Sequence, residues 1–285
     1  MTPDDAAALR EVVALALAED LGAAGDVTTL ACVPADVPYK AAFVARAAGV
    51  VAGLEATRAV FAAVDPEVTF EPRLEDGARI ECGAVLADVR GSVHALLAAE
   101  RTALNLLTHL SGIATSTAAF VAEVAGTGCM VRDTRKTLPG LRALQKAAVV
   151  AGGGVNHRHG LSDGLLVKDN HIHAAGGVTE AVRRAHAASD GLDVQIEVDS
   201  LEQLDEALRA GARSVLLDNF SLNDLPAAVT RCHRRDEPVF VEASGGVTLA
   251  SAWAIASTGV DAIAVGACTH SAPALDIGLD FEGLA

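Results

Sequence analysis

Six short runs rich in aliphatic and β-branched residues recur along the second half of the chain, and helical segments separate them. The runs are CMVRD (129–133), LLVKD (165–169), VQIEVD (194–199), SVLLDN (214–219), VFVEA (239–243) and AIAVG (262–266). Their spacing of about 20–35 residues is typical of strand–helix units, which place successive strands parallel in one sheet. About six such units suit a closed or nearly closed α/β barrel. An open, doubly wound sheet is the alternative.

Charged residues gather where these runs end. Five runs finish on or near one, and the sixth finishes on glycine: Arg132–Asp133, Lys168–Asp169, Glu197, Asp218, Glu242 and Gly266. A single charge after a strand is ordinary because turns are polar. In a parallel barrel, however, the carboxyl ends of the strands build the active site. Charges at five of the six ends therefore favour a polar site at one mouth of a barrel.

Positive charge is concentrated between residues 132 and 173. This segment of 42 residues holds seven of the 22 Lys and Arg, four of the nine His and only three of the 37 acids, in a chain of net charge −15. A local reversal of charge on an acidic protein indicates a pocket for a small, multiply charged anion. Solvated surface bases are the alternative, but Lys168 directly follows the apolar run GLLV, which places it at a strand end.

The remaining composition narrows the class of protein. The net charge of −15 and an aromatic content of 3% argue against nucleic acid as the main partner. The sequence contains no run of about 20 strongly apolar residues, so we predict no membrane span. The N-terminus lacks the pattern of a signal peptide, so we expect a cytoplasmic protein. The five cysteines form no C-x-x-C pair, which disfavours a zinc site or a disulfide framework and predicts core or near-core thiols.

The first part of the chain has a different pattern. We expect a helix over 4–20, a turn at Gly22–Asp26, strands around one helix near 54–63, and a long helix at about 93–110. Leu96, Leu97, Leu104 and Leu107 form the apolar stripe of the long helix, whereas Arg101, Asn105 and Thr108 share another face. The prediction is therefore an α+β domain that ends near residue 112, followed by the barrel.

Three groups of residues could carry chemistry. Arg135, Lys136, Arg158 and Lys168, with His157 nearby, suit a dicarboxylate, because guanidinium groups bind carboxylates through paired hydrogen bonds. Glu197 and Asp218 could hold Mg²⁺ or accept hydrogen bonds from sugar hydroxyls, and turn acids are the alternative. Glycine-containing turns at Ser244–Gly246 and Gly266–His270 could bind phosphate through backbone N–H groups, although glycine also serves any tight turn. Gly152–Gly154 could simply end a helix. Together these groups outline a site for phosphoribosyl transfer.

The chain resembles the quinolinate phosphoribosyltransferase family, the carboxylating nicotinate-nucleotide pyrophosphorylases, over nearly its whole length. The most specific segments are DTRKTLPG (133–140), GGGVNHRHG (152–160) and VKDNH (167–171), in this order and spacing. The resemblance implies an N-terminal α/β sandwich domain (1–112, with the tail 273–285) and an incomplete α/β barrel (113–272). It also implies transfer of phosphoribosyl from phosphoribosyl pyrophosphate to quinolinate, with decarboxylation to nicotinate mononucleotide.

The same resemblance implies roles for individual residues. Arg135, His157, Arg158 and Lys168 would hold the quinolinate carboxylates, with Thr134 beside them. Lys136 would face both substrates, and Lys136, Lys168, Glu197 and Asp218 would form the catalytic group. Glu197 and Asp218 would meet the ribose hydroxyls or Mg²⁺. Two loops would cradle the 5′-phosphate: Ser244, Gly245 and Gly246, and Ala267, Cys268 and Thr269. Arg101 would reach the site of the other subunit of a homodimer. The sequence leaves dimer or hexamer open, and no organic cofactor is required.

Other interpretations remain at this stage. Ala147 stands where the family is expected to carry an aromatic residue, at a position that suggests packing. Paralogous proteins associated with molybdenum transport share the fold and part of the pattern. Lys168 could also be a Schiff-base lysine at a strand end. A non-catalytic anion-binding protein would bind quinolinate and release no pyrophosphate.

Overall fold

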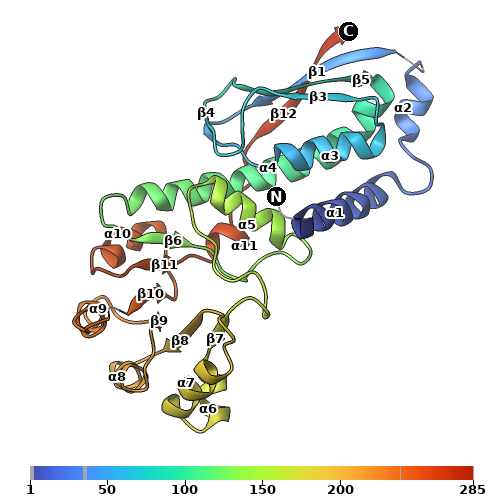
Figure 1. The fold of residues 1–285 in the computed structure, drawn as a ribbon. Coiled ribbons are helices and arrows are strands. Elements are labelled where there is room, and N and C mark those ends of the chain that lie inside the picture. The colour runs from blue at the N-terminus through green and yellow to red at the C-terminus, as the bar shows by residue number, and fades with distance from the viewer. Residues whose placement is uncertain (1–2, 35–36, 238, 285) are drawn as a thin grey trace. The chain divides into compact units, whose positions relative to one another are not determined.

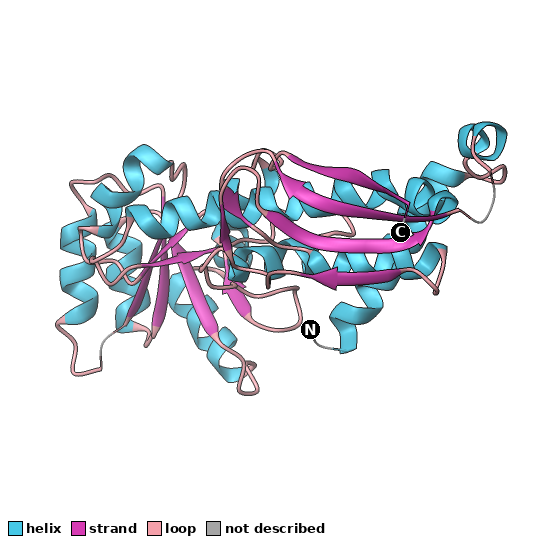
Figure 2. Cartoon of the chain, turned by 90° about the horizontal axis from the view of Figure 1, so that it is seen from above, coloured by secondary structure: helices cyan, strands magenta, loops and turns pink. Residues whose placement is uncertain are grey.

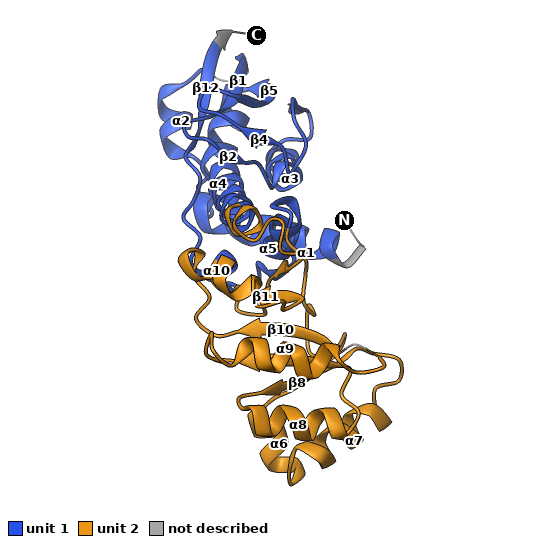
Figure 3. Cartoon of the chain, turned by 90° about the vertical axis from the view of Figure 1, so that its left-hand side faces the viewer, with its two compact units in different colours: residues 1–118, 137–153, 268–285 blue, residues 119–136, 154–267 orange. Residues whose placement is uncertain are grey.

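A computed structural model describes residues 3–34, 37–237 and 239–284. The chain forms two compact units, which Figure 3 colours separately. Unit 1 comprises Met1–Ala118, Thr137–Gly153 and Cys268–Ala285, and unit 2 comprises Ala119–Lys136 and Gly154–Ala267. Unit 1 thus contains the predicted N-terminal domain and its C-terminal tail, and also three segments that the prediction assigned to the barrel, namely 113–118, Thr137–Gly153 and 268–272.

Unit 2 is built on a six-stranded parallel sheet (Figure 1). Its strands are β6 (Met130–Arg132), β7 (Leu165–Val167), β8 (Val194–Val198), β9 (Ser214–Asp218), β10 (Phe240–Ser244) and β11 (Ala262–Ala264). All six predicted strands are therefore confirmed. The β-branched residues of these runs form the buried interior: Ile196, Val215, Val241 and Ile263 are each inaccessible to solvent.

The strand order distinguishes a barrel from a doubly wound sheet. It runs β6-β11-β10-β9-β8-β7, so the chain moves in one direction from β7 to β11 and the last strand then pairs with the first. A doubly wound sheet would instead reverse direction at a switch point. In the described part of the chain β6 and β7 are the edge strands, so the barrel is incomplete, as predicted.

Helices connect the strands and lie along the outside of the sheet (Figure 2). They are α6 (Asp169–Ala175), α7 (Val178–Ala187), α8 (Leu201–Arg209), α9 (Leu225–His233) and α10 (Leu249–Ala256). Local chemistry sets where two of them begin, since the Ser200 and Thr248 hydroxyls accept backbone N–H bonds at the N-termini of α8 and α10. Leu204 and Leu208 of α8 are buried at helical spacing, which gives that helix its apolar face.

Unit 1 contains an antiparallel sheet in the order β12-β1-β5-β3. Its strands are β1 (Pro38–Ala45), β3 (Thr69–Pro72), β5 (Val85–Ser92) and β12 (Ile277–Leu284), and β2 (Gly49–Val50) pairs with β4 (Arg79–Ile80). Phe43, Phe61 and Phe70 pack together between this sheet and α3 (Leu54–Val64). Because β12 pairs with β1, the C-terminal tail returns to the first domain, as the resemblance implied.

The helices of unit 1 agree only partly with the prediction. α1 (Pro3–Leu21) and α3 are confirmed, whereas α2 (Val27–Cys32) was not predicted. α4 (Val93–Glu123) continues well beyond the predicted end near 110. Gly112 lies inside α4, where a Cβ would stand 2.0 Å from the Pro273 carbonyl oxygen, so glycine permits the close approach of the C-terminal tail.

Thr137–Gly153 contains α5 (Arg142–Ala151), which ends at Gly152 as anticipated. The cysteines correct another prediction, because Cys32 and Cys82 are exposed and only Cys129, Cys232 and Cys268 are buried. Burial raises the pKa of the Cys129 and Cys232 thiols to about 12, which keeps both protonated. No described helix has the length and apolar character needed to cross a membrane.

Candidate active site

A cavity of about 540 Å³ lies at the carboxyl ends of the unit 2 strands. All of its lining residues belong to unit 2. They include eleven of the predicted site residues: Thr134, Arg135, Lys136, His157, Arg158, Lys168, Glu197, Asp218, Ser244, Gly245 and Gly246. The structure therefore brings the cationic group, the two carboxylates and one glycine turn to a single site.

Two arginines dominate the electrostatics of this cavity. The Arg158 Nη1 donates to the Gly164 carbonyl oxygen at 2.9 Å, but the Nε atoms of Arg158 and Arg135 are both buried without a hydrogen-bond partner among the described residues. Burial lowers the pKa of Arg158, and repulsion from Arg135 lowers it further. Two neighbouring guanidinium groups with unpaired buried N–H groups are costly unless an anion satisfies them. This arrangement therefore fits an anionic ligand.

Lys168 and Glu197 form an ion pair at the same mouth. Lys168 follows β7 as the residue that caps α6, and its Nζ lies 2.6 Å from Glu197 Oε2. The Lys168 side chain is 46% exposed and that of Glu197 only 14%. Because Glu197 offsets the charge of Lys168, Lys168 is held in place but adds less net positive charge than Arg135 and Arg158.

The glycine turn after β10 is pressed against the end of β9. Gly245 and Gly246 have φ of 102° and 58°, and a Cβ on Gly245 would stand 2.1 Å from Asn219 Oδ1. Asn219 donates its backbone N–H to the Ser244 carbonyl oxygen at 2.8 Å and its side-chain amide to Asp218 at 2.8 Å. Only glycine fits this close approach. Successive backbone N–H groups in such a turn form a concave site for anions.

Three residues that shape the cavity were given no individual role from the sequence, although Asp133 and Glu242 were among the charges expected at the strand ends. Asn219 stands in the left-handed region with φ of 56°, which no sequence pattern announced. Asp133 is buried, and its Oδ1 accepts the His157 backbone N–H at 2.8 Å. Glu242 lies in the middle of β10 and is inaccessible to solvent, whereas we expected a charge at the end of the strand. The alternation of strand side chains would have indicated an inward-facing Glu242.

Four predicted residues are not among those that line the cavity. Arg101 is exposed on α4 in unit 1. Ala267, Cys268 and Thr269 begin the short helix α11 (Ala267–His270), where Cys268 and Thr269 are buried. Their predicted contacts with substrate stay predictions.

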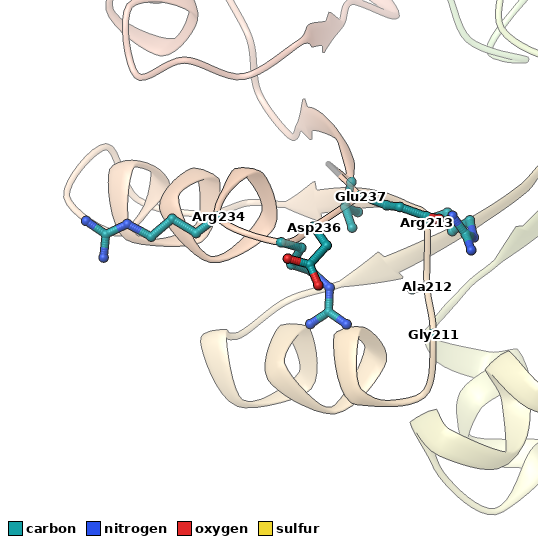
Figure 4. Close-up of a pocket in the computed structure, with 8 residues that line it drawn as sticks. Gly211, Ala212, Arg213, Arg234, Asp236 and Glu237 are labelled. Atoms are coloured by element: carbon teal, nitrogen blue, oxygen red, sulfur yellow. Dashed lines mark ion pairs between the residues drawn. The ribbon is translucent and has the colours of Figure 1, made fainter.

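A second hollow lies at the opposite, amino ends of β9 and β10 (Figure 4). It is lined by Gly211–Arg213 and by residues around Asp236, and Arg213 forms an exposed ion pair with Glu237. Exposed ion pairs of this kind contribute little to stability. The active sites of α/β barrels lie at the carboxyl ends of the strands, not at the amino ends. We therefore assign the site to the carboxyl ends.

The carboxylates limit how a metal ion could be held. The described residues contain no group of three or more His, Cys, Asp or Glu arranged around one point. Four carboxylates line the cavity, but Asp133 and Glu242 are buried and accept hydrogen bonds from the protein, which leaves Glu197 and Asp218 as the more accessible oxygen donors. Mg²⁺ commonly uses one or two protein carboxylates and completes its shell with substrate phosphates and water. The site thus fits Mg²⁺ that arrives with a phosphorylated substrate, rather than a closed protein cage.

An incomplete α/β barrel with a cationic cavity and a glycine turn at its strand ends defines an enzyme acting on small anionic substrates. The chain belongs to the quinolinate phosphoribosyl transferase family: the N-terminal domain of that family matches residues 26–111 and the C-terminal domain matches residues 113–280. The recognition made from the sequence is therefore confirmed.

Known proteins that are similar to this chain support the same family assignment. It is 50% identical over 277 residues to the nicotinate-nucleotide pyrophosphorylase [carboxylating] of Mycobacterium leprae, covering 96% of this chain and 97% of the relative. The solved nicotinate-nucleotide pyrophosphorylase of Francisella tularensis superposes with a TM-score of 0.93 at 37% identity, covering 99% and 98% of the two chains. NadC from Streptococcus pyogenes gives 0.91 at 38% identity, covering 100% and 98%.

Proposed function

We propose that the chain transfers the phosphoribosyl group of phosphoribosyl pyrophosphate to the ring nitrogen of quinolinate, with loss of CO₂, to give nicotinate mononucleotide and pyrophosphate. The observation that carries this proposal is the pair Arg135 and Arg158, which line the cavity and whose buried Nε atoms have no hydrogen-bond partner among the residues that the structure describes. Quinolinate carries two adjacent carboxylates, which suit two adjacent guanidinium groups. Family membership over almost the whole chain supports the same reaction.

The remaining residues suit the second substrate. We assign the 5′-phosphate to the backbone N–H groups of Ser244–Gly246, and the ribose hydroxyls to Glu197 and Asp218, whose oxygens can accept hydrogen bonds. Lys136 also lines the cavity and would face the pyrophosphate. Mg²⁺, when bound with the substrate, would neutralise charge on the pyrophosphate, and Glu197 and Asp218 are the residues that would hold it directly or through water.

The chemistry then follows from position and charge. Pyrophosphate departs as the C1–O bond of the ribose breaks, and C1 becomes oxocarbenium-like. The pyridine nitrogen, held in line by its carboxylates on Arg135 and Arg158, forms the new C–N bond. Alignment of the two reactants and fixed positive charge beside the leaving group supply the acceleration. The ring nitrogen then carries positive charge, which stabilises the electron pair left on C2 as CO₂ departs, and C2 takes up a proton.

A product assay tests the function. Purified protein is given Mg²⁺ and phosphoribosyl pyrophosphate with quinolinate, with nicotinate or with no acceptor, and products are resolved by mass. We expect nicotinate mononucleotide and CO₂ only in the reaction that contains quinolinate. Nucleotide formed from nicotinate would contradict the proposal. Quinolinate binding without pyrophosphate release would indicate an anion-binding protein, and borohydride trapping on Lys168 would indicate Schiff-base chemistry.

We further propose a homodimer with shared sites, in which Arg101 acts in the site of the other subunit. An exposed arginine on α4, outside the unit that forms the cavity, is the feature that supports it. Mixing the inactive variants Arg101→Ala and Lys168→Ala should then restore activity in about a quarter of the sites, since half of the dimers are mixed and each contains one intact site. A verified mixed dimer without recovered activity would contradict sharing.

A further inference from the structure

A hydrogen-bonded row of largely buried polar side chains crosses the interior of the barrel beneath the cavity. Arg132 Nη1 at the end of β6 donates to Glu242 Oε2 of β10 at 2.8 Å. Gln195 Nε2 of β8 donates to the same oxygen at 2.8 Å, and Gln195 Oε1 lies 2.8 Å from His157 Nε2. Glu242 is inaccessible to solvent and Gln195 is 6% exposed. These hydrogen bonds therefore link three strands to His157 in the cavity wall.

The chemistry of these groups fixes the direction of each hydrogen bond. The Glu242 carboxylate, paired with Arg132, only accepts, so the Gln195 amide must point its NH₂ group toward it. The Gln195 carbonyl oxygen consequently faces His157, and His157 Nε2 must donate. His157 Nδ1 accepts the Arg158 backbone N–H at 2.8 Å. A ring that donates from Nε2 and accepts at Nδ1 is neutral imidazole with its proton on Nε2.

We propose that Glu242 and Gln195 are positioning residues, which hold His157 as the neutral Nε2–H tautomer and so set the ring against Arg158. His157 Nε2 lies 3.9 Å from Glu242 Oε2, beyond hydrogen-bond distance, and the neutral Gln195 amide stands between them. A carboxylate in direct contact would favour imidazolium, which would add a third positive charge beside Arg135 and Arg158. The Gln195 amide therefore fixes the orientation of the His157 ring but places no charge in contact with it.

This arrangement deepens the proposed function and rests on it for the substrate. Both ring nitrogens of His157 have protein partners, so the charges that bind the dicarboxylate come from the arginines and Lys168. His157 instead orients the backbone of Arg158. Loss of the hydrogen bonds from Glu242 through Gln195 to His157 should leave Arg158 less well positioned. It should therefore weaken quinolinate binding more than it slows the chemical step.

The test is a ¹⁵N-histidine NMR spectrum of the full-length protein without substrate, with His157 assigned by its loss in His157→Asn. We expect an unprotonated Nδ1 and a protonated Nε2 whose hydrogen exchanges slowly with solvent. Gln195→Met should abolish the protected Nε2–H signal and raise the KM for quinolinate about tenfold, which corresponds to the loss of one buried hydrogen bond, with a smaller change in kcat. Gln203→Met, the same change on α8 outside the cavity, should alter neither.

Glu242→Gln serves as the conservative variant. One amide oxygen in place of Glu242 Oε2 can still accept from both Arg132 and Gln195, so the Nε2–H signal should persist. A proton on Nδ1, an imidazolium at neutral pH, or a protected Nε2–H signal in Gln195→Met would each overturn the proposal. Because the spectrum needs no substrate, a failed tautomer assignment with normal turnover of quinolinate would leave the proposed function intact. A correct spectrum without turnover would instead reject the function.

Discussion

Arg158→Ala is expected to raise the KM for quinolinate about a hundredfold, because hydrogen bonds to charged groups in a buried site contribute about 1.5–3 kcal/mol. The Arg158 side chain lines the cavity, and its buried Nε atom has no hydrogen-bond partner among the described residues. The KM for phosphoribosyl pyrophosphate should change far less, since the Ser244–Gly246 turn binds that substrate in our assignment. Steady-state kinetics with each substrate varied in turn provide the measurement.

The same variant should behave differently in an unfolding experiment. Its loss of the hydrogen bond to Gly164 is offset by relief of the repulsion from Arg135 and of the cost of burying a charge. We therefore expect little change in the free energy of unfolding, which is typical of residues selected for binding rather than stability. Arg184→Ala, an exposed arginine of α7, is the control and should change neither property. An equal loss of affinity for both substrates would reject the assignment of Arg158 to quinolinate.

Glu242→Leu is expected to lower the free energy of unfolding by about 3–5 kcal/mol, because it leaves the Arg132 guanidinium in the barrel interior without its counter-charge. Arg132 lies 2.8 Å from Glu242, and their side chains are 19% and 0% exposed. Urea denaturation followed by circular dichroism provides the measurement. Glu180→Ala, which removes a carboxylate from an exposed pair on α7, should cause a far smaller loss.

A double variant separates the ion pair from the packing. Arg132→Met with Glu242→Leu removes both charges, so most of the lost stability should return. Arg132 also lies over the Phe240 ring at 5.7 Å, and a methionine can keep part of that contact. If the double variant is as unstable as Glu242→Leu alone, the loss comes from packing or from the unpaired Gln195 amide rather than from an unpaired charge.

Much of unit 2 could be predicted because its signals are local. Each strand is a short apolar run, and the Lys168 and Asp218 positions at strand ends follow from where those runs stop. The strand order, in contrast, depends on which runs pair, and the apolar pattern is compatible with both a barrel and an open sheet. Pairing of β11 with β6 excluded the open sheet.

The prediction of unit 1 was wrong at two places, one where a distant segment packs against a helix and one where a local cap forms a short helix. We expected the long helix to end near residue 110, but α4 continues to Glu123, and its Ser111 and Thr115 hydroxyls accept hydrogen bonds from the backbone N–H groups of Ala52 and Val50. The short helix α2 depends on Asp26, whose carboxylate accepts the Thr28 and Thr29 N–H groups. Aspartate followed by threonines also occurs in turns, so composition alone did not reveal this helix.

The sequence by itself determined the β/α alternation, the charges at the strand ends and, through its motifs, the family. These properties depend on neighbours along the chain, and local physics is sufficient to predict them. Only the tertiary structure decided that Arg135 and Arg158 line one cavity with their Nε atoms buried, and that Glu242 and Gln195 form the hydrogen-bonded path to His157 through the barrel. Both depend on burial and on hydrogen bonds between residues far apart in the chain, and these exist only once the strands have paired.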